Sequence, residues 1–459
     1  MKIVIAGAGE VGSHLAKLLS YENQDIVLVD RDASKLADMD ANYNLMTMVG
    51  SPTSFHTLRD AGVENCDLFI AVTPYESTNV ISCSIAKRIG AGRTVARIDN
   101  YEFMNQENKE YFATIGVDSL IYPEYLAAQE IITALKRPWV RHWFELHDGE
   151  IILVGVKMRE TAQLIGMQLK ELAAIQPTFH VSAIKRHHNT IIPRGDDYIK
   201  LDDILYFTTT RDHVNDLLEI CGKIDFDVRK VMIMGGSRIA IRTVDLADND
   251  FKFKIIEKNM DVCQILAEQC PDCDIVHDDA RDIDVLREEG ISDVDAFIAL
   301  TESSETNILA CIMAKEFGVA KTIAEVENLQ LVSEAEGLNI GTTINKKLLA
   351  SSTIFQLLLD ADSSTSKCHA LTDAEVAEIV ARPGSKITRG AVKNLSLSRD
   401  MTIAGLVRDG VGMLVTGNTE IQAGDHVVVF CLTGALHKVE KLFTESQLQS
   451  TLCIKIIHK

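Results

Sequence analysis

Short apolar runs alternate with amphipathic segments along roughly the first 137 residues of the chain. The runs are continuous, which is typical of parallel strands that are covered by helices on both faces. They predict strands at Lys2–Ala6, Asp25–Val29, Leu45–Val49, Leu68–Val72, Thr94–Ile98 and Ser119–Ile121. The segments between them predict helices, among them Gly12–Ser20, Thr78–Ile89 and Pro123–Lys136. Strands that alternate with helices favour an α/β domain built on a parallel sheet.

Residues 140–223 have a different pattern, rich in strands and turns. They predict strands at Phe144–Val156, His180–Lys185 and Ile204–Thr209. The polar segments Pro193–Asp197 and Leu201–Asp203 have turn composition. A small, strand-rich lobe therefore follows the first α/β domain.

The whole arrangement occurs twice. An offset of 228 positions, as between Gly62 and Gly290, places Asn79 on Asn307. An offset of 222 relates the two small lobes and places Asp203 on Asp425 and Arg186 on Arg408. Self-similarity over so long a period indicates two domain-sized copies. We expect four domains, at residues 1–138, 139–225, 226–362 and 363–448, with Ser363–Ser366 as an exposed linker.

A glycine-rich turn follows the first predicted strand. Its three glycines fit the spacing G-x-G-x-x-G, and Asp30 ends the next strand. Glycines at this spacing let the backbone approach a pyrophosphate at a helix N-terminus, and the acid holds ribose hydroxyls. We therefore expect an α/β fold of two tandem doubly wound, Rossmann-like domains, each followed by a small α+β C-terminal lobe.

The first predicted site lies where the strands of such a sheet end. Backbone amides of Gly9–Val11 would meet phosphate, and Asp30 favours NAD over NADP because its carboxylate disfavours a 2′-phosphate. Thr73 offers a hydroxyl or backbone donor, and Arg97 offers a cation or, alternatively, an ion pair with Asp99 or Glu102. The predicted residues are Gly7, Ala8, Gly9, Glu10, Val11, Gly12, Asp30, Arg31, Thr73, Pro74 and Arg97.

The second predicted site is a degraded copy. Ser237 and Ala240 replace the second and third glycines, Asp278–Ala280 replaces Gly50–Pro52, and Glu325 replaces Arg97. More acid and less base weaken binding of a polyanion unless a cation such as Arg238 assists. We expect either a nucleotide site or a packing module that has lost its ligand. The predicted residues are Gly235, Gly236, Ser237, Arg238, Ile239, Glu257, Asp279, Ala280 and Thr301.

The composition limits the partners. The 459 residues carry a net charge of −20 and have a pI near 5.1. An acidic chain without a basic stripe argues against nucleic acid but leaves room for a basic partner, such as the cytoplasmic loops of a membrane protein. No apolar run reaches the ~18 residues of a membrane-spanning helix. Because the first strand begins at the N-terminus, we expect no signal peptide and a soluble, cytosolic chain.

Other chemistry is sparse. The ten cysteines show no disulfide pattern, and the pair Cys270 and Cys273 lacks the further ligands of a zinc site, so a plain turn is favoured over a redox or metal role. His187 and His188 predict a solvated hairpin turn, and the tail Leu452–Lys459 has no counterpart in the first half. We predict no metal site and no catalytic residue. The lobes that follow the two ligand domains show no His/Asp dyad, Cys nucleophile or metal cluster at readable spacing. Two ligand domains without catalytic chemistry favour a sensor.

The glycine turn with Asp30, the run Asp67–Thr73 with Asn79, and the duplication together resemble the family of Trk potassium-uptake regulatory subunits, over residues 1–445. Their modules are called RCK or KTN domains, each with a Rossmann lobe and a C-terminal lobe. The resemblance implies a non-enzymatic protein on the inner face of the membrane that forms a ring as a homo-oligomer, a dimer or tetramer of chains. It also implies that NAD(H), ATP or ADP binds the ring and gates a potassium-translocating membrane subunit.

The resemblance also carries over site residues. The family's first-site residues fall on Gly7, Gly9, Gly12, Asp30, Thr73 and Arg97. Its second-site residues fall on Gly235, Ser237, Arg238, Glu257, Asp279 and Thr301. Two alternatives to a gating subunit remain: an NAD-dependent oxidoreductase, and a structural assembly protein whose pockets are vestigial.

Overall fold

The computed structural model describes residues 1–459 except 22–23, 188, 339, 360–366, 371–373 and 444–459. The expected linker Ser363–Ser366, the tail Leu452–Lys459 and His188 lie outside the described residues. The chain forms two compact units, Met1–Arg141 with Asp225–Phe355, and His142–Ile224 with Gln356–Lys459. The first unit joins the two α/β domains and the second joins the two small lobes. The four exact domain boundaries stay predictions.

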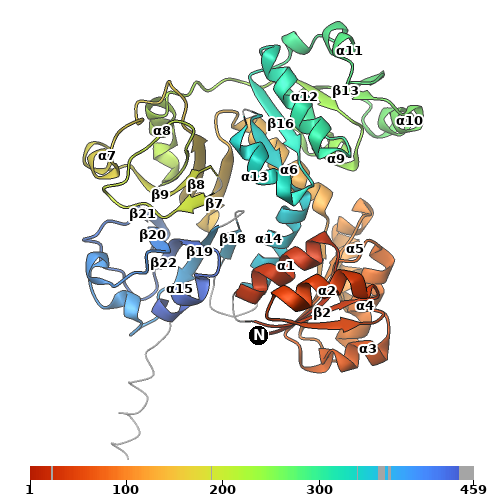
Figure 1. Cartoon of the computed structure of the whole chain (residues 1–459), viewed down its shortest axis with the longest axis horizontal. Helices are drawn as coiled ribbons and strands as arrows, with labels where there is room; N and C mark the ends of the chain where they lie inside the picture. Colours follow the sequence, from red (N-terminus) through yellow and green to blue (C-terminus); the bar gives the residue numbers. More distant parts are fainter. Residues whose placement is uncertain (22–23, 188, 339, 360–366, 371–373, 444–459) are drawn as a thin grey trace, which may run out of the picture. The chain divides into compact units, whose positions relative to one another are not determined.

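Each α/β domain contains a six-stranded parallel sheet (Figure 1). The strand orders are β3-β2-β1-β4-β5-β6 and β14-β13-β12-β15-β16-β17, which is the doubly wound order, so the predicted fold class is confirmed. The first sheet contains β1 (Lys2–Ala6), β2 (Asp25–Asp30), β3 (Met46–Val49), β4 (Leu68–Ala71), β5 (Arg93–Arg97) and β6 (Ser119–Ile121). The second contains β12 (Lys230–Met234), β13 (Lys252–Glu257), β14 (Asp274–His277), β15 (Ala296–Ala299), β16 (Lys321–Glu325) and β17 (Thr342–Ile344).

The helices of the first domain are α1 (Glu10–Tyr21), α2 (Ala33–Asn42), α3 (Phe55–Asp60), α4 (Glu76–Ile89), α5 (Gln106–Thr114) and α6 (Pro123–Lys136). Those of the second are α9 (Arg238–Leu246), α10 (Met260–Gln269), α11 (Ile283–Glu288), α12 (Ser304–Glu316), α13 (Leu329–Gly337) and α14 (Lys346–Leu359). The three helices whose bounds were predicted, α1, α4 and α6, start and end within two residues of those bounds. None of the described helices combines the length and the apolarity needed to cross a membrane.

Helix α6 joins the two α/β domains. Pro123 occupies its first turn, where a missing backbone N–H costs nothing. Its buried side chains Ala127, Ile131 and Leu135 share one hydrophobic core with Ile239 of α9 and Ile233 of β12. Because a helix of the first domain completes the core of the second, the two domains form one unit.

The second unit contains two five-stranded antiparallel sheets with the same order, β10-β9-β11-β8-β7 and β21-β20-β22-β19-β18. The strands and helices of the first lobe are β7 (His142–Leu146), β8 (Ile151–Lys157), α7 (Leu169–Ile175), β9 (Phe179–Arg186), β10 (Asn189–Ile191), β11 (Ile204–Thr209) and α8 (Val214–Ile220). Those of the second are β18 (Lys367–Ala370), β19 (Ala374–Val380), β20 (Met401–Arg408), β21 (Val411–Leu414), β22 (His426–Leu432) and α15 (Leu436–Phe443).

The two small lobes repeat each other in detail. Arg186 and Asp203 form a two-pronged ion pair, with Nε–Oδ1 and Nη2–Oδ2 distances of 2.8 and 2.7 Å. Arg408 and Asp425 repeat it at 2.8 and 2.6 Å, which confirms the offset of 222. The lobes also share one core, in which the rings of Tyr206 and Phe430 are tilted with centroids 5.8 Å apart.

One predicted strand is wrong. Phe144–Val156 is not continuous, because β7 and β8 form an antiparallel hairpin around the turn His147–Gly149. His147, Asp148 and Gly149 have φ angles of 48°, 56° and 88°, in the left-handed region. The dipeptide Asp148-Gly149 is a strong signal for such a turn. It was overlooked because apolar residues on both sides favoured one continuous strand.

Candidate nucleotide-binding sites

The first glycine turn connects β1 to α1, at the point where the strand order reverses between β1 and β4. Gly7 has a φ of 111°, and a Cβ there would lie 2.9 Å from the backbone nitrogen of Thr73. A Cβ on Gly12 would lie 1.8 Å from the Gly7 carbonyl oxygen. A Cβ on Gly9, by contrast, would meet no atom within 4 Å. Gly7 and Gly12 are thus needed for packing. Gly9 leaves open space at the N-terminus of α1, where anions are favoured.

Asp30 clamps this turn. Its Oδ2 accepts a hydrogen bond from the backbone N–H of Ala8 at 2.6 Å, and its Oδ1 accepts one from Asp32 at 2.9 Å. Each carboxylate oxygen can accept a further hydrogen bond, so ribose hydroxyls can still bind. The side chain that was predicted to contact ribose therefore also positions the backbone that was predicted to contact phosphate.

Asn79 is a positioning residue that the sequence reasoning missed as part of the site. This fully buried side chain accepts hydrogen bonds from the backbone N–H and the hydroxyl of Thr73 at 2.9 and 2.7 Å. Its amide donates to the carbonyl oxygens of Thr73 and Arg97, both at 2.9 Å. Asn307 repeats this arrangement around Thr301. The duplication could have revealed this role, because both α/β domains have a buried asparagine at the same place, Asn79 and Asn307.

Arg97 lies at the end of β5 and pairs with Asp99 at 3.4 Å. It also lines a cavity of about 330 Å³, together with Gly9, Glu10, Val11 and Pro74. The Nε of Arg97 is buried and makes no hydrogen bond within the described part of the chain. The Arg97 side chain is thus held at the first site, and its Nε–H can still donate a hydrogen bond to a ligand. Arg31 lies nearby on the surface, where it donates to Ser51 at 2.8 Å.

Two lysines that the sequence reasoning missed reach this cavity from the second α/β domain. Lys346 and Lys347 begin α14 and line the cavity. Lys347 forms ion pairs with Glu10 and Glu327, and Lys346 pairs with Glu325 at 3.2 Å. No local pattern marks them as site residues, because they reach the first site only through the packing of the two domains.

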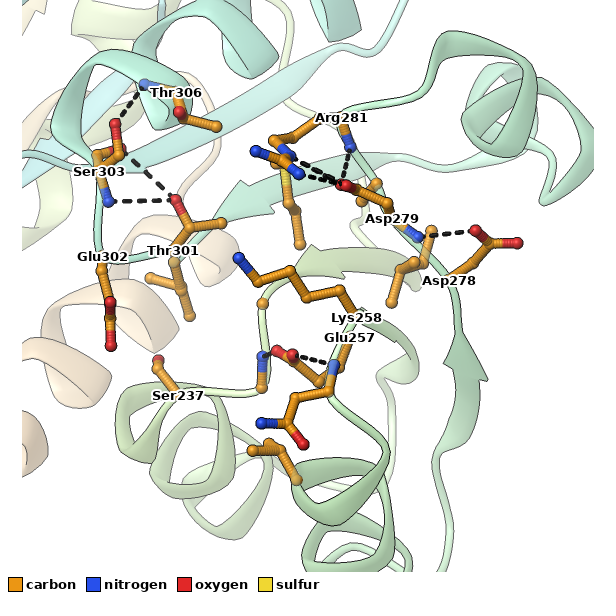
Figure 2. Close-up of a pocket in the computed structure, with 18 residues that line it drawn as sticks. Ser237, Glu257, Lys258, Asp278, Asp279, Arg281, Thr301, Glu302, Ser303 and Thr306 are labelled. Atoms are coloured by element: carbon orange, nitrogen blue, oxygen red, sulfur yellow. Dashed lines mark hydrogen bonds and ion pairs between the residues drawn. The ribbon is translucent and has the colours of Figure 1, made fainter.

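The second site is a cavity of about 570 Å³ (Figure 2). Seven predicted residues line it: Gly235, Gly236, Ser237, Glu257, Asp279, Ala280 and Thr301. Glu257 repeats the clamp, since Oε2 accepts from Gly236 and Oε1 accepts from Asn259, both at 2.7 Å. The oxygen of Ser237 accepts from the backbone N–H of Ala240 and so caps α9.

The other two predicted residues of the second site lie elsewhere. Ile239 is buried in the core shared with α6. Arg238 lines the cavity of the first site, where it donates to the Asp99 carbonyl at 3.2 Å and pairs with Glu124 at 3.5 Å. Since Arg238 begins α9, the packing of α9 on α6 directs it toward the first domain.

Different cations serve the second cavity. Figure 2 shows Lys258 reaching into it from the end of β13. Arg281 donates to both oxygens of Asp279, at 2.9 and 3.0 Å, and this contact lowers the pKa of Asp279 to about 2. Glu325, the counterpart of Arg97, is 3% exposed, and burial raises its pKa to about 7. The second cavity thus has two cations at new positions, and four carboxylates also line it: Glu257, Asp278, Asp279 and Glu302.

No histidine or cysteine lines either cavity within the described residues. Carboxylates and cations line both cavities, and hydroxyl side chains line the second one only. Backbone amides and cations are groups that suit a phosphate, and carboxylates suit hydroxyl donors.

Comparisons with known proteins agree with this architecture. The TrkA-N domain family matches residues 3–123 and 231–346, and the TrkA-C domain family matches residues 153–222 and 376–444. The Trk system potassium uptake protein TrkA of Halomonas elongata is 30% identical over 450 residues, covering 96% of this chain and 98% of that protein. A TrkA homolog of Archaeoglobus fulgidus is 31% identical over 448 residues, covering 96% and 100%.

Solved structures share the fold at lower identity. The GsuK channel bound to NAD matches with a TM-score of 0.59 and 15% identity, covering 96% of this chain and 78% of that one. The crystal structure of the GsuK RCK domain matches with a TM-score of 0.58 and 16% identity, covering 100% and 95%. At this identity the likeness concerns the fold alone.

Proposed function

The chain belongs to the TrkA family of regulatory proteins of potassium uptake, and we propose that it senses NAD(H) or an adenine nucleotide and gates a potassium-translocating membrane subunit. Proteins of this family are not enzymes, which sets aside the oxidoreductase alternative.

One observation carries the ligand proposal: the open space over Gly9, beside the clamped carboxylate of Asp30. A phosphate at the head of α1 takes backbone N–H donors and the positive end of the helix dipole. The carboxylate accepts from the ribose hydroxyls of the same ligand. NAD(H), ATP and ADP all contain this adenosine phosphate chemistry, so they compete for the same turn.

The position of the first cavity supports a sensing role. Gly9 and Arg97 come from the first α/β domain, and Lys346 and Lys347 come from the second. A polyanion in this cavity attracts both lysines, so its binding free energy depends on how the two domains are arranged. A ligand that binds one arrangement more tightly shifts the population toward it.

We further propose that the chain acts on the inner face of the membrane, as a homo-oligomer beneath its membrane partner. The acidic net charge of −20 suits contact with the basic cytoplasmic loops of such a partner. The second cavity, with Lys258 and Arg281, is proposed as a weaker nucleotide site.

The test substitutes the open glycine. Gly9→Ala adds a methyl group where the chain leaves 4 Å of free space, so the protein should fold normally while close approach of phosphate is blocked. Thermal shifts of the full chain with NADH, ATP and ADP report affinity, because stabilisation follows RT ln(1 + [L]/Kd). We expect the variant to lose most of the shift. Gly337→Ala, at another glycine with open space, is the matched control and should keep it.

Potassium flux through a co-expressed membrane partner tests gating. We expect the ligand to change flux with the native chain and to have no effect with Gly9→Ala. A full thermal shift in Gly9→Ala would overturn the proposed site. No ligand effect on flux with the native chain would leave a structural assembly protein as the remaining interpretation.

A further inference from the structure

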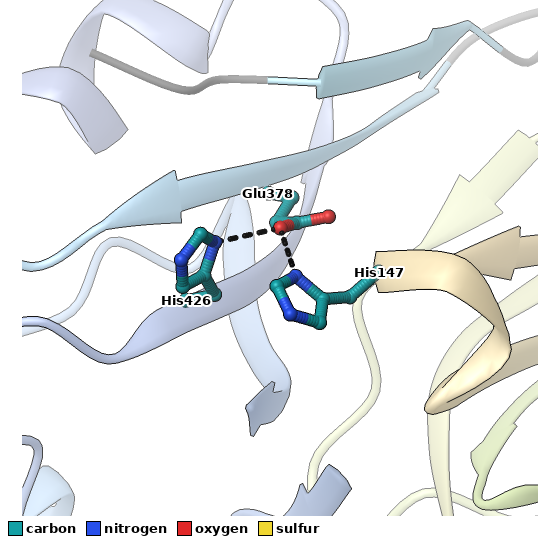
Figure 3. A group of neighbouring side chains, drawn as sticks. All are labelled: His147, Glu378 and His426. Carbon is teal, nitrogen blue, oxygen red and sulfur yellow. Dashed lines mark hydrogen bonds and ion pairs between the residues drawn. The ribbon is translucent and has the colours of Figure 1, made fainter. Parts of the chain in front are cut away.

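The unit of small lobes contains a cluster that the nucleotide sites do not use. His147, Glu378 and His426 place one ligand atom each within 4.8 Å of one another (Figure 3). The Nδ1 atoms of His147 and His426 each lie 2.9 Å from the same oxygen, Oε1 of Glu378. The two imidazole rings are tilted, with centroids 4.4 Å apart.

Separate elements bring these side chains together. Glu378 and His426 lie on neighbouring antiparallel strands, β19 and β22, where Glu378 pairs with Val428 and His426 pairs with Val380. Residues two apart share a face of a sheet, so Glu378 and His426 are diagonal neighbours on one face. His147 comes from the left-handed turn between β7 and β8 of the other small lobe.

The carboxylate of Glu378 is only half satisfied. The residue is 3% exposed, and within the described residues its Oε2 has no hydrogen-bond partner. A buried ionised oxygen without a partner is costly, and such groups are normally paired or coordinate a metal. A cation next to Oε1 would compensate the charge of this buried carboxylate.

We propose that His147, Glu378 and His426 bind a divalent first-row metal ion, with Zn²⁺ as the best match. Two imidazole nitrogens and one carboxylate oxygen are the donor set that this class of ion prefers. Two ligands of a tetrahedral Zn²⁺ lie about 3.3 Å apart, given metal–ligand distances near 2.0 Å. The observed nitrogen–oxygen distances of 2.9 Å are a few tenths of an ångström shorter, so small side-chain rotations admit the ion.

Binding requires a change of tautomer. Facing a carboxylate, each Nδ1 now donates its proton, whereas a metal takes the nitrogen lone pair. On coordination each neutral imidazole would carry its proton on Nε2, and the fourth coordination position would hold water or Oε2. The ion would join the turn of one small lobe to the sheet of the other and stabilise their pairing.

The local sequence does not reveal this site. Its ligands are 231 and 48 positions from Glu378, and none lies in a metal-binding motif. The two strand positions are not duplicated either, because the offset of 222 places Val156 and Ile204 at the corresponding positions of the first lobe. The copies therefore differ in metal chemistry, and the proposal is independent of nucleotide binding.

The test measures Zn²⁺ bound to the chelator-stripped full chain by equilibrium dialysis with elemental analysis. We expect about one equivalent of tight Zn²⁺ per chain and weak binding of Mg²⁺ and Ca²⁺. His147→Asn should weaken Zn²⁺ binding by at least about 100-fold, since even outer-shell partners cost 10–100-fold. Asn tolerates the left-handed backbone of this turn, so the variant should fold.

Two further variants serve as controls. His213→Asn removes another histidine–carboxylate pair, His213 with Asp216 at 3.0 Å, and should leave Zn²⁺ binding unchanged. Cys273→Ser removes one thiol of the only close cysteine pair in the sequence, and it should also leave binding unchanged. Substitution by Co²⁺ should give visible d–d bands without thiolate charge-transfer absorption.

Metal-dependent thermal stability gives a second readout. Zn²⁺ should raise the melting temperature of the native chain and of His213→Asn, but not that of His147→Asn or Glu378→Gln. Undiminished tight Zn²⁺ binding in a folded His147→Asn would overturn the proposal. So would a native chain that binds no Zn²⁺, which would leave the three side chains as a hydrogen-bonded triad.

Discussion

The two glycine turns share a backbone clamp but differ in what surrounds it. In each, one carboxylate accepts hydrogen bonds from the turn and from the residue two positions after the acid, through Asp30 in one copy and Glu257 in the other. The open Gly9 is replaced by Ser237, and the cationic Arg97 by the buried Glu325. Both copies therefore keep the clamp, whereas the two positions that the proposed ligand would contact differ between them.

The two sites also obtain their cations differently. The first site contains Arg97 from its own domain, and Arg238, Lys346 and Lys347 of the other α/β domain also line its cavity. The second relies on Lys258 and Arg281 of its own domain. Under the proposed function, a ligand in the first site would report on the arrangement of two domains, whereas a ligand in the second would report mainly on one. This difference predicts that the first site is the regulatory one.

The largest expected effect concerns the third position of the glycine pattern, which is Gly12 in the first turn and Ala240 in the second. Gly12→Ala would place Cβ 1.8 Å from the Gly7 carbonyl oxygen, so the turn itself must move. We expect the free energy of unfolding to fall by about 3 kcal/mol, the upper part of the range for overpacking. Ala240 already occupies the corresponding position, and Ala240→Gly should cost about 1 kcal/mol or less. Chemical denaturation measures the unfolding free energy of both variants. Equal decreases for Gly12→Ala and Ala240→Gly would contradict the expected difference in packing between the two turns.

The second prediction compares the two clamping acids. Asp30→Ala removes acceptors for the turn and for ribose, and we expect NADH affinity to fall by about 2 kcal/mol, the size of a hydrogen bond to a charged group. Glu257→Ala should lower NADH affinity much less if the first site dominates. Isothermal titration calorimetry measures both, with melting temperatures as a check on folding. A larger loss in Glu257→Ala would reverse the ranking of the sites.

The third prediction uses pH. Burial raises the pKa of Glu325 from 4.5 to about 7, so the folded chain keeps a proton that the unfolded chain loses over that interval. The stabilisation is fully present below pH 4.5 and is lost as pH rises through about 7. Glu325→Gln should remove this dependence, changing the difference in unfolding free energy between pH 5 and pH 8 by on the order of 2 kcal/mol. Chemical denaturation of both proteins at pH 5 and pH 8 measures this difference. An equal change in unfolding free energy between the two pH values for the native chain and Glu325→Gln would contradict the prediction.

The smallest effect concerns the second residue of the degraded turn. Ser237→Gly restores the open position seen at Gly9 and removes the cap of α9, which costs only a few tenths of a kcal/mol when glycine replaces serine. We expect the second site to bind ATP more tightly with little change in stability. Thermal shifts in a Gly9→Ala background isolate that site. Weaker ATP binding would indicate that the serine hydroxyl itself contacts the ligand.

The sequence by itself determined the duplicated α/β plan, because continuous apolar runs, helical segments and turn residues are local signals. Helix α6 was predicted at its observed bounds, since Pro123 starts it and Arg137-Pro138 follows it. Asp30 and Glu257 were also predicted, as acceptors for ribose, because a glycine turn and an acid after the next strand lie close together in this fold. Their hydrogen bonds to the turn backbone were not predicted. The overlooked turn at His147–Gly149 was local too, although its Asp-Gly signal lay between apolar residues.

Only the tertiary structure decided which side chains meet across separate domains and lobes. Arg238 was assigned to the second site from its position in the turn, yet the packing of α9 on α6 directs it to the first. Lys346, Lys347 and the group His147, Glu378 and His426 come together over separations that no local pattern spans. The physical reason is that such contacts depend on how folded surfaces pack, which is set by the buried faces of all elements together rather than by any one segment.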